Sequence, residues 1–142
     1  MQRYSQAAAA AVVAILLLIA HRAAYKGYFS DDDLDNLVNT RTISAEVFAK
    51  EFATPRFAVS NFRPSGHLFY RLVGDAAGLR IGPYIAVLHL LHGFNIVLVW
   101  LVLRRMGAPP VGRWAGALMF AFHMAVFDAL WKPMYIFDVL CG

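Results

Sequence analysis

Carboxylates are concentrated in one short stretch of the chain, which reads Ser30-Asp31-Asp32-Asp33-Leu34-Asp35-Asn36. A carboxylate within hydrogen-bond reach of a hydroxyl can accept its proton, so Asp31, Asp32 and Asp33 are candidate catalytic bases. Aspartates are also favoured at helix starts, where they accept hydrogen bonds from free backbone N–H groups and interact well with the helix dipole. These two roles are compatible, because one aspartate can cap a helix while its neighbour reacts. A divalent cation is a third interpretation, and it needs oxygen ligands from other segments.

Arg63 is the candidate anion-binding residue, within the motif Asn61-Phe62-Arg63-Pro64-Ser65-Gly66-His67. A guanidinium group presents its N–H donors in a planar fork that matches two phosphate oxygens. The alternative interpretation is an arginine at a membrane surface that pairs with lipid headgroups.

His89, His92 and Asn95 follow one another at steps of three residues, which places them along one face of a helix. In a membrane helix such groups usually face neighbouring helices and hydrogen-bond to them. No metal site is predicted here, because no carboxylate or cysteine shares this spacing. His123 and Asp128 suggest a similar setting, and Asp128 is a functional candidate because acids inside a membrane are rare and usually functional.

The composition predicts that most of the chain lies in a membrane. Its 142 residues are 60% hydrophobic and 15% charged, with a mean hydropathy of +0.55. Soluble domains average about 45–50% apolar and about 25% charged residues. The same figures exclude a disordered chain, and a single cysteine, Cys141, excludes a disulfide scaffold.

Three apolar segments supply the expected membrane spans, since about 20 apolar residues are needed to cross ~30 Å of hydrocarbon. We predict transmembrane helices over about 7–24, 83–103 and 114–131, and the start of a fourth at 135–140. The predicted fold is thus an all-α integral membrane domain over residues 1–142, expected to be the amino-terminal part of a longer multi-pass protein. A cleaved signal peptide is the alternative for the first segment, but no small-x-small cleavage site follows it.

Basic residues predict the orientation of these spans. Arg104, Arg105 and Arg113 lie in the short connection after the second span, which marks that connection as cytoplasmic. The amino terminus with Arg3 is then cytoplasmic, and the loop 25–82 is extracytoplasmic. These charges flank apolar segments and form no stripe that would follow a phosphate backbone, so nucleic acid is not an expected partner.

The extracytoplasmic loop is expected to fold into short helices that cap the outer ends of the spans. One helix is predicted behind Asp31–Asp33, and a second near Ser44, where Glu46 and Lys50 have the favourable i,i+4 order. A third begins at Arg63-Pro64, with proline in its first turn, and ends at Gly78. No strand pattern or internal repeat competes with this helical prediction.

The order of these motifs resembles the GT-C class of multi-pass glycosyltransferases, in particular the subgroup of O-mannosyltransferases and bacterial enzymes of similar layout. The matching segments are Asp32-Asp33-Leu34-Asp35-Asn36, Phe62-Arg63-Pro64, His92-Gly93-Phe94-Asn95, and His123 followed by Asp128 and Asp138. The chain departs from the subgroup at Met124, where a proline is usual, at Asp128, where a glutamate is usual, and around Ile136, where an arginine is missing.

The resemblance implies transfer of a sugar from a polyprenyl-phosphate-linked donor to an acceptor hydroxyl on the extracytoplasmic face, in a bacterial inner membrane. It implies that Asp32 is the base, with Asp33 and Asp31 as alternatives. Arg63 would bind the departing phosphate, and the matched positions His92 and Asp128 would complete the substrate site. No cofactor is implied, although a divalent cation stays possible, and the expected partners are the bilayer, the lipid-linked donor and an unidentified acceptor.

A non-enzymatic multi-pass membrane protein is the alternative function. In a transporter subunit or an assembly factor, the polar residues of the spans would only hold helices together. A transporter typically shows broken helices or a repeated half, and neither is evident in the sequence.

Overall fold

The computed structural model describes residues 2–54 and 63–140, and its regular structure in these ranges is entirely helical, which confirms the predicted all-α class. Cys141, Asn61 and Phe62 lie outside these ranges. The helices are α1 (Gln2–Ala20), α2 (Asp31–Arg41), α3 (Ala45–Glu51), α4 (Pro64–Ala77), α5 (Ile81–Arg105), α6 (Pro110–Ala121), α7 (Met124–Phe127) and α8 (Ile136–Val139). Short 3₁₀ turns lie at η1 (Ala24–Lys26), η2 (Asp128–Leu130) and η3 (Pro133–Tyr135).

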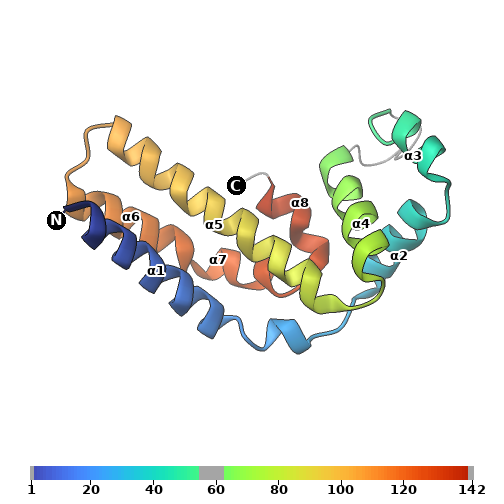
Figure 1. Cartoon of the computed structure of the whole chain (residues 1–142), viewed down its shortest axis with the longest axis horizontal. Helices are drawn as coiled ribbons and strands as arrows, with labels where there is room; N and C mark the ends of the chain where they lie inside the picture. Colours follow the sequence, from blue (N-terminus) through green and yellow to red (C-terminus); the bar gives the residue numbers. More distant parts are fainter. Residues whose placement is uncertain (1, 55–62, 141–142) are drawn as a thin grey trace.

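The helix α5 includes the whole predicted span 83–103. Its 25 residues give a length of about 37 Å. Within the described ranges it is the one helix long and apolar enough to cross a membrane. Its last turn carries Arg104 and Arg105, whose charges complement the negative end of the helix dipole. Gly107 follows with a φ of 79°, a conformation open to glycine, and α6 returns along α5 (Figure 1).

The first predicted span, 7–24, continues past the carboxyl end of the helix, because α1 ends at Ala20. The carbonyl of Leu17 accepts the backbone N–H of His21 and also its side-chain Nδ1–H, at 3.1 and 3.0 Å. The imidazole therefore folds back on the last turn of α1, and the chain turns into η1.

The third predicted span, 114–131, is not a continuous helix. The α-helix α6 begins earlier, at Pro110, and ends at Ala121, and α7 restarts after His123. At the break, Nε2 of His92 lies 3.2 Å from the carbonyl oxygen of Ala121, and the N–H of Ala125 donates to Nδ1 of His123 at 3.2 Å. In a continuous helix the N–H of Ala125 would donate to the carbonyl of Ala121. Here each of these two backbone groups bonds to an imidazole. The apolar stretch 135–140 forms only α8, which packs on α4 and α5.

The predicted loop helices correspond to α2, α3 and α4, which we call the cap. The predicted starts of α3 and α4 are confirmed, whereas α2 begins at Asp31, so the three aspartates form its first turn and do not precede it. Ser30 precedes α2 in a capping box with Asp33, and Ser44 accepts the N–H of Val47 at the start of α3. Pro64 begins α4, and Gly78, with a φ of 61°, ends it. Figure 1 shows the cap at one end of the molecule and the amino terminus, the end of α5 and the start of α6 at the other.

The cap is tightly packed because Gly74 lets α2 approach α4. A Cβ atom there would lie 2.8 Å from Cδ of Arg41 and 3.2 Å from Cδ2 of Leu37. Beneath this contact, the fully buried side chains of Tyr70 and Tyr84 join the cap to α5. The acidic start of α2 is therefore fixed against α4.

Candidate functional site

Asp33 is the buried centre of the acidic turn. Its Oδ2 accepts hydrogen bonds from the backbone N–H and the Oγ–H of Ser30, at 2.8 and 2.7 Å. Its Oδ1 accepts the hydroxyl of Tyr70 at 2.7 Å, across 37 residues of sequence. Asp33 is fully buried, and both of its oxygens are engaged. In this arrangement it fixes α2 to α4, as a helix cap and a tertiary crosslink.

Tyr70 is a permanent donor in this network. Its burial, followed by the hydrogen bond and the negative charge of Asp33, raises the pKa of Tyr70 far above its usual value of 10.0. The phenol therefore stays protonated and keeps donating to Asp33 at any physiological pH.

Asp31 and Asp32 are exposed at the same helix start. The carboxylates of these two residues form no hydrogen bond or ion pair with the part of the chain that the structure describes. The backbone carbonyl of Asp32 accepts a hydrogen bond from the side chain of Asn36 at 2.7 Å. The three neighbouring aspartates thus differ sharply: one is an anchor, and two are available to solvent or to a substrate. Asp32, next to the anchor, is held on a rigid helix turn.

The position of Arg63 depends on Gly66. A Cβ atom at Gly66 would overlap with the ring of Phe137, so only glycine lets that ring lie on the first turn of α4. The guanidinium carbon of Arg63 then lies 5.0 Å from the centre of the same ring, a cation–π distance. Arg63 is exposed and keeps its N–H donors accessible.

The acidic turn and Arg63 border the same segment, η3 and α8, without touching each other. Oγ of Ser30 lies 3.3 Å from Sδ of Met134, and Phe137, beneath Arg63, lies three residues further along the chain. Arg63 precedes Tyr70 by seven residues, which is about 10 Å along a helix. The acidic turn, through Ser30, and the exposed guanidinium of Arg63 therefore share one wall, formed by η3 and α8.

His92 and Asp128 do not join this group. His92 is buried, bonded to Ala121 and stacked on Phe120, with ring centres 5.3 Å apart. Asp128 is exposed at the start of η2. Asn95, on the same face as His92, donates to the carbonyl of Val139 at 2.7 Å. His92 and Asn95 therefore bond to neighbouring segments, as the packing interpretation predicted, whereas Nδ1 of His89 bonds to the carbonyl of Ile85 in its own helix.

Arg71 is a residue that the sequence did not single out. Its Nη1 donates to the carbonyls of Thr40 and Ile43, both at 2.8 Å, and its Nε donates to Asp75 at 2.7 Å. It thereby satisfies carbonyls at the end of α2 and ties that end to α4. In the sequence Arg71 follows Tyr70 within a predicted helix, and nothing in its spacing marks it as a residue that binds carbonyls.

A second group missed by the sequence lies where α1 ends. His21 and His89 are buried, with ring centres 5.3 Å apart, and Tyr25 stacks on His89 at 5.4 Å. Nε2 of each histidine has no hydrogen-bond partner among the described residues. The sequence marked His89 as a polar residue of the second predicted span and His21 as an interruption of the first, but nothing in the sequence placed the two together. No three His, Cys, Asp or Glu side chains converge as a metal site requires, within the described ranges.

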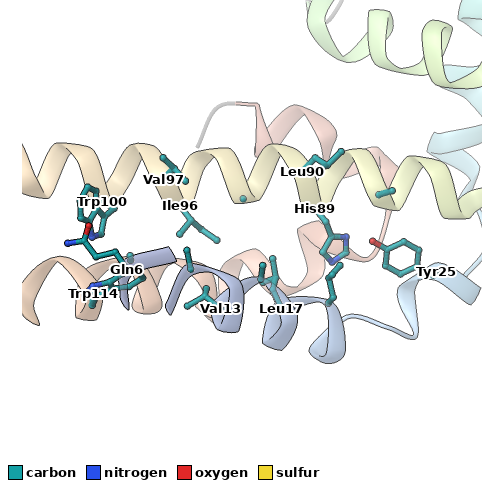
Figure 2. A pocket seen from close by; sticks show the side chains of 16 residues that line it. Gln6, Val13, Leu17, Tyr25, His89, Leu90, Ile96, Val97, Trp100 and Trp114 are labelled. Carbon is teal, nitrogen blue, oxygen red and sulfur yellow. The ribbon is translucent and has the colours of Figure 1, made fainter. Parts of the chain in front are cut away.

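This aromatic and imidazole group closes one end of an apolar groove of about 700 Å³ between α1, α5 and α6. Figure 2 shows Tyr25 and His89 at that end and Gln6, Trp100 and Trp114 at the other. Val13 and Leu17 of α1 face Ile96 and Val97 of α5 across the space between.

Comparisons of the chain with protein-family models, with curated proteins and with solved structures gave no match.

Proposed function

We propose that the chain is embedded in a membrane through α1, α5 and the broken segment from α6 to η2, with the cap on the extracytoplasmic side. The support is the large apolar surface of these helices, where large side chains of each are exposed. In α5, 22% of the most apolar window is buried, which is low for a helix at the centre of a soluble core. Exposed residues include Val12, Ile15, Leu16, Leu18, Ile19, Leu90, Phe94, Val97, Leu98, Leu101, Val102, Leu118 and Met119. Such a patch is costly in water and favourable in lipid.

The orientation is supported by the end of the molecule opposite the cap. Arg104 and Arg113 lie over the ring of Trp100, at 5.8 and 5.9 Å, and Trp114 lies 6.5 Å from Trp100. Tryptophans are enriched at the membrane interface, and arginines in short loops mark the cytoplasmic side. The amino terminus lies at the same end (Figure 1), so the amino terminus and the connection between α5 and α6 are both assigned to the cytoplasm.

Within this frame we propose that the cap contributes to sugar transfer from a polyprenyl-phosphate-linked donor. The observation that carries the proposal is the division of labour in the acidic turn, where buried Asp33 anchors the helix start and its neighbour Asp32 stays exposed. Asp32 takes the proton of the acceptor hydroxyl while the hydroxyl oxygen bonds to the anomeric carbon. The bond from that carbon to the phosphate oxygen breaks, and Arg63 stabilises the charge on the departing lipid phosphate.

The test is Asp32→Asn in membranes from cells that express the complete gene, supplied with a radiolabelled polyprenyl-phosphate sugar. Sugar transfer is expected to fall at least about a hundredfold, because a general base contributes 10²–10⁴-fold. Asp35→Asn, an exposed aspartate one turn further along α2, is the matched control and should retain activity. Full activity in Asp32→Asn and in Asp31→Asn, with normal membrane insertion, would reject the assignment of the base.

A non-enzymatic membrane assembly factor is the second candidate, and a specific observation favours it. His92 and Asn95 both bond to backbone carbonyls of other segments, which is the use of polar groups expected for helix packing. Under this alternative, Asp32→Asn changes no enzymatic activity, while His92→Leu releases partner proteins that copurify with the wild-type chain.

A further inference from the structure

The groove between α1, α5 and α6 exists because α1 stands away from its neighbours. In residues 6–20 of α1, Leu17 is the only buried side chain. The walls are formed mainly by aliphatic and aromatic side chains, with small residues such as Ala14, Ala86 and Gly93 widening the space. A volume of about 700 Å³ is in the range of ligand sites.

The groove is long enough for the hydrocarbon of one leaflet of a bilayer. On α5 its lining runs from Ala86 to Trp100, fourteen residues apart, which is about 21 Å of helix. A single leaflet contributes about half of the ~30 Å hydrocarbon core. An acyl chain that enters beside Trp100 therefore fits within the groove, whose other end lies at Tyr25 and Ala86.

The positive charges at the Trp100 end of the groove favour a lipid with a negatively charged headgroup. Arg104 and Arg113 both lie over Trp100, a residue that lines the groove. The sequence has no aspartate or glutamate in residues 1–30 or 76–127, which include all of α1, α5 and α6. The two guanidinium groups therefore meet no carboxylate on the helices that form the groove, and a lipid phosphate would supply the missing anion.

We propose that this groove binds an anionic phospholipid of the cytoplasmic leaflet, with one acyl chain between α1 and α5 and the phosphate at Arg104 and Arg113. Basic pockets between transmembrane helices on the cytoplasmic side bind anionic headgroups in this way. The inference rests on the membrane placement proposed above, but not on the sugar-transfer chemistry, which involves the opposite end of the molecule.

The headgroup contact is tested by native mass spectrometry of the chain purified from vesicles of phosphatidylglycerol and phosphatidylcholine in equal amounts. The wild type should retain phosphatidylglycerol. The double variant Arg104→Gln/Arg113→Gln should bind it about thirtyfold more weakly, from the usual contribution of two basic residues at an anionic surface. Arg22→Gln/Arg80→Gln removes the same charge at the other end of the apolar helices and should bind as the wild type does.

The acyl-chain contact is tested with two glycines of α5. A Cβ atom at Gly93 or at Gly82 meets no other atom within 4 Å, but only Gly93 lines the groove. Gly93→Leu should fill the groove and abolish lipid retention, whereas Gly82→Leu should leave it unchanged. Should Gly93→Leu lose its helical circular dichroism, Ala14→Leu fills the same space from α1.

The two proposals fail in distinguishable ways. A chain that alkaline carbonate extracts from membranes contradicts the membrane placement itself. A chain that stays in the membrane but retains both lipids equally, or retains lipid unchanged in Gly93→Leu and Ala14→Leu, overturns the lipid site. A lipid-free dimer that Gly93→Leu dissociates would also overturn it, since a second copy would then occupy the groove.

Discussion

The cap and the group of α1, α5 and α6, which we call the body, are stabilised by different interactions. In the cap, buried polar groups are paired with one another, as Asp33 is with Ser30 and Tyr70. In the body, aliphatic side chains are exposed on every helix and a groove separates α1 from α5. Val38 and Leu72 are exposed on the cap too, but its helices are joined by buried hydrogen bonds, whereas the body exposes apolar side chains along the whole length of its helices. The membrane placement proposed above would cover this surface of the body.

The strongest test of this contrast is Asp33→Ala in the cap. The substitution removes three hydrogen bonds to a charged acceptor and leaves the Tyr70 hydroxyl buried without its partner. We expect a loss of about 4 kcal/mol in the stability of the cap. Hydrogen exchange in detergent should show faster opening of amides in α2 and α4, with the amides of α5 unaffected. Equal acceleration in α5 would show that the cap and the body unfold as one unit.

Gly66→Val tests the junction where the cap meets α8. The added side chain overlaps with Phe137, and overpacking of this kind costs about 2 kcal/mol. Displacement of the ring should also remove the cation–π contact with Arg63. The double variant Gly66→Val/Phe137→Ala is expected to recover part of the lost stability in chemical denaturation. If Gly66→Val alone is as stable as the wild type, the contact of Phe137 with α4 does not contribute to stability.

His92→Leu tests a buried polar contact of the body. The carbonyl of Ala121 loses its imidazole partner in a buried position, at an expected cost of about 1–2 kcal/mol. Because His123 still accepts the N–H of Ala125, the break between α6 and α7 should persist. Backbone amide shifts by NMR would report it, and a continuous helix from α6 to α7 in this variant would assign the break to His92 alone.

Lys50→Ala should have the smallest effect, because polar contacts on the outside of the cap are exposed to solvent and stabilise it less than the buried ones do. Nζ of Lys50 lies 2.6 Å from Oε1 of Glu46, but both side chains are more than 70% exposed. An exposed i,i+4 pair contributes about 0.5 kcal/mol or less. The midpoint of chemical denaturation should be nearly unchanged. A loss comparable to that of Asp33→Ala would contradict the assignment of cap stability to buried pairs.

The sequence predicted the elements whose signals are local. Ser44, Pro64 and Gly78 mark helix ends through their own backbone preferences, and the structure has helices beginning and ending there. The helix over 83–103 was likewise predicted from an uninterrupted apolar run. The break within 114–131 was not predicted, because one of its two imidazole contacts comes from His92, a residue 29 positions before the carbonyl that it contacts.

The roles within the acidic turn show the same limit. The spacing from Ser30 to Asp33 allows a local capping box, but the contact that buries Asp33 and leaves Asp32 exposed comes from Tyr70, 37 residues away. The contribution of Gly66 to the position of Arg63 likewise requires Phe137, which comes 71 residues later. Candidate residues could be named from their types, but the division between anchoring and exposed groups needed the fold.

The wall shared by the acidic turn and Arg63 has a consequence for the order in which the protein is made. Ser30 contacts Met134 across 104 residues, whereas the pair of Asp33 and Tyr70 needs only the first half of the chain. Domains assemble from the amino terminus during synthesis, so the cap can close long before residues 133–139 leave the ribosome. The candidate site is then a late product of translation, completed only after α5 and α6 have been synthesised, and a nascent chain released early would carry a folded cap without its wall.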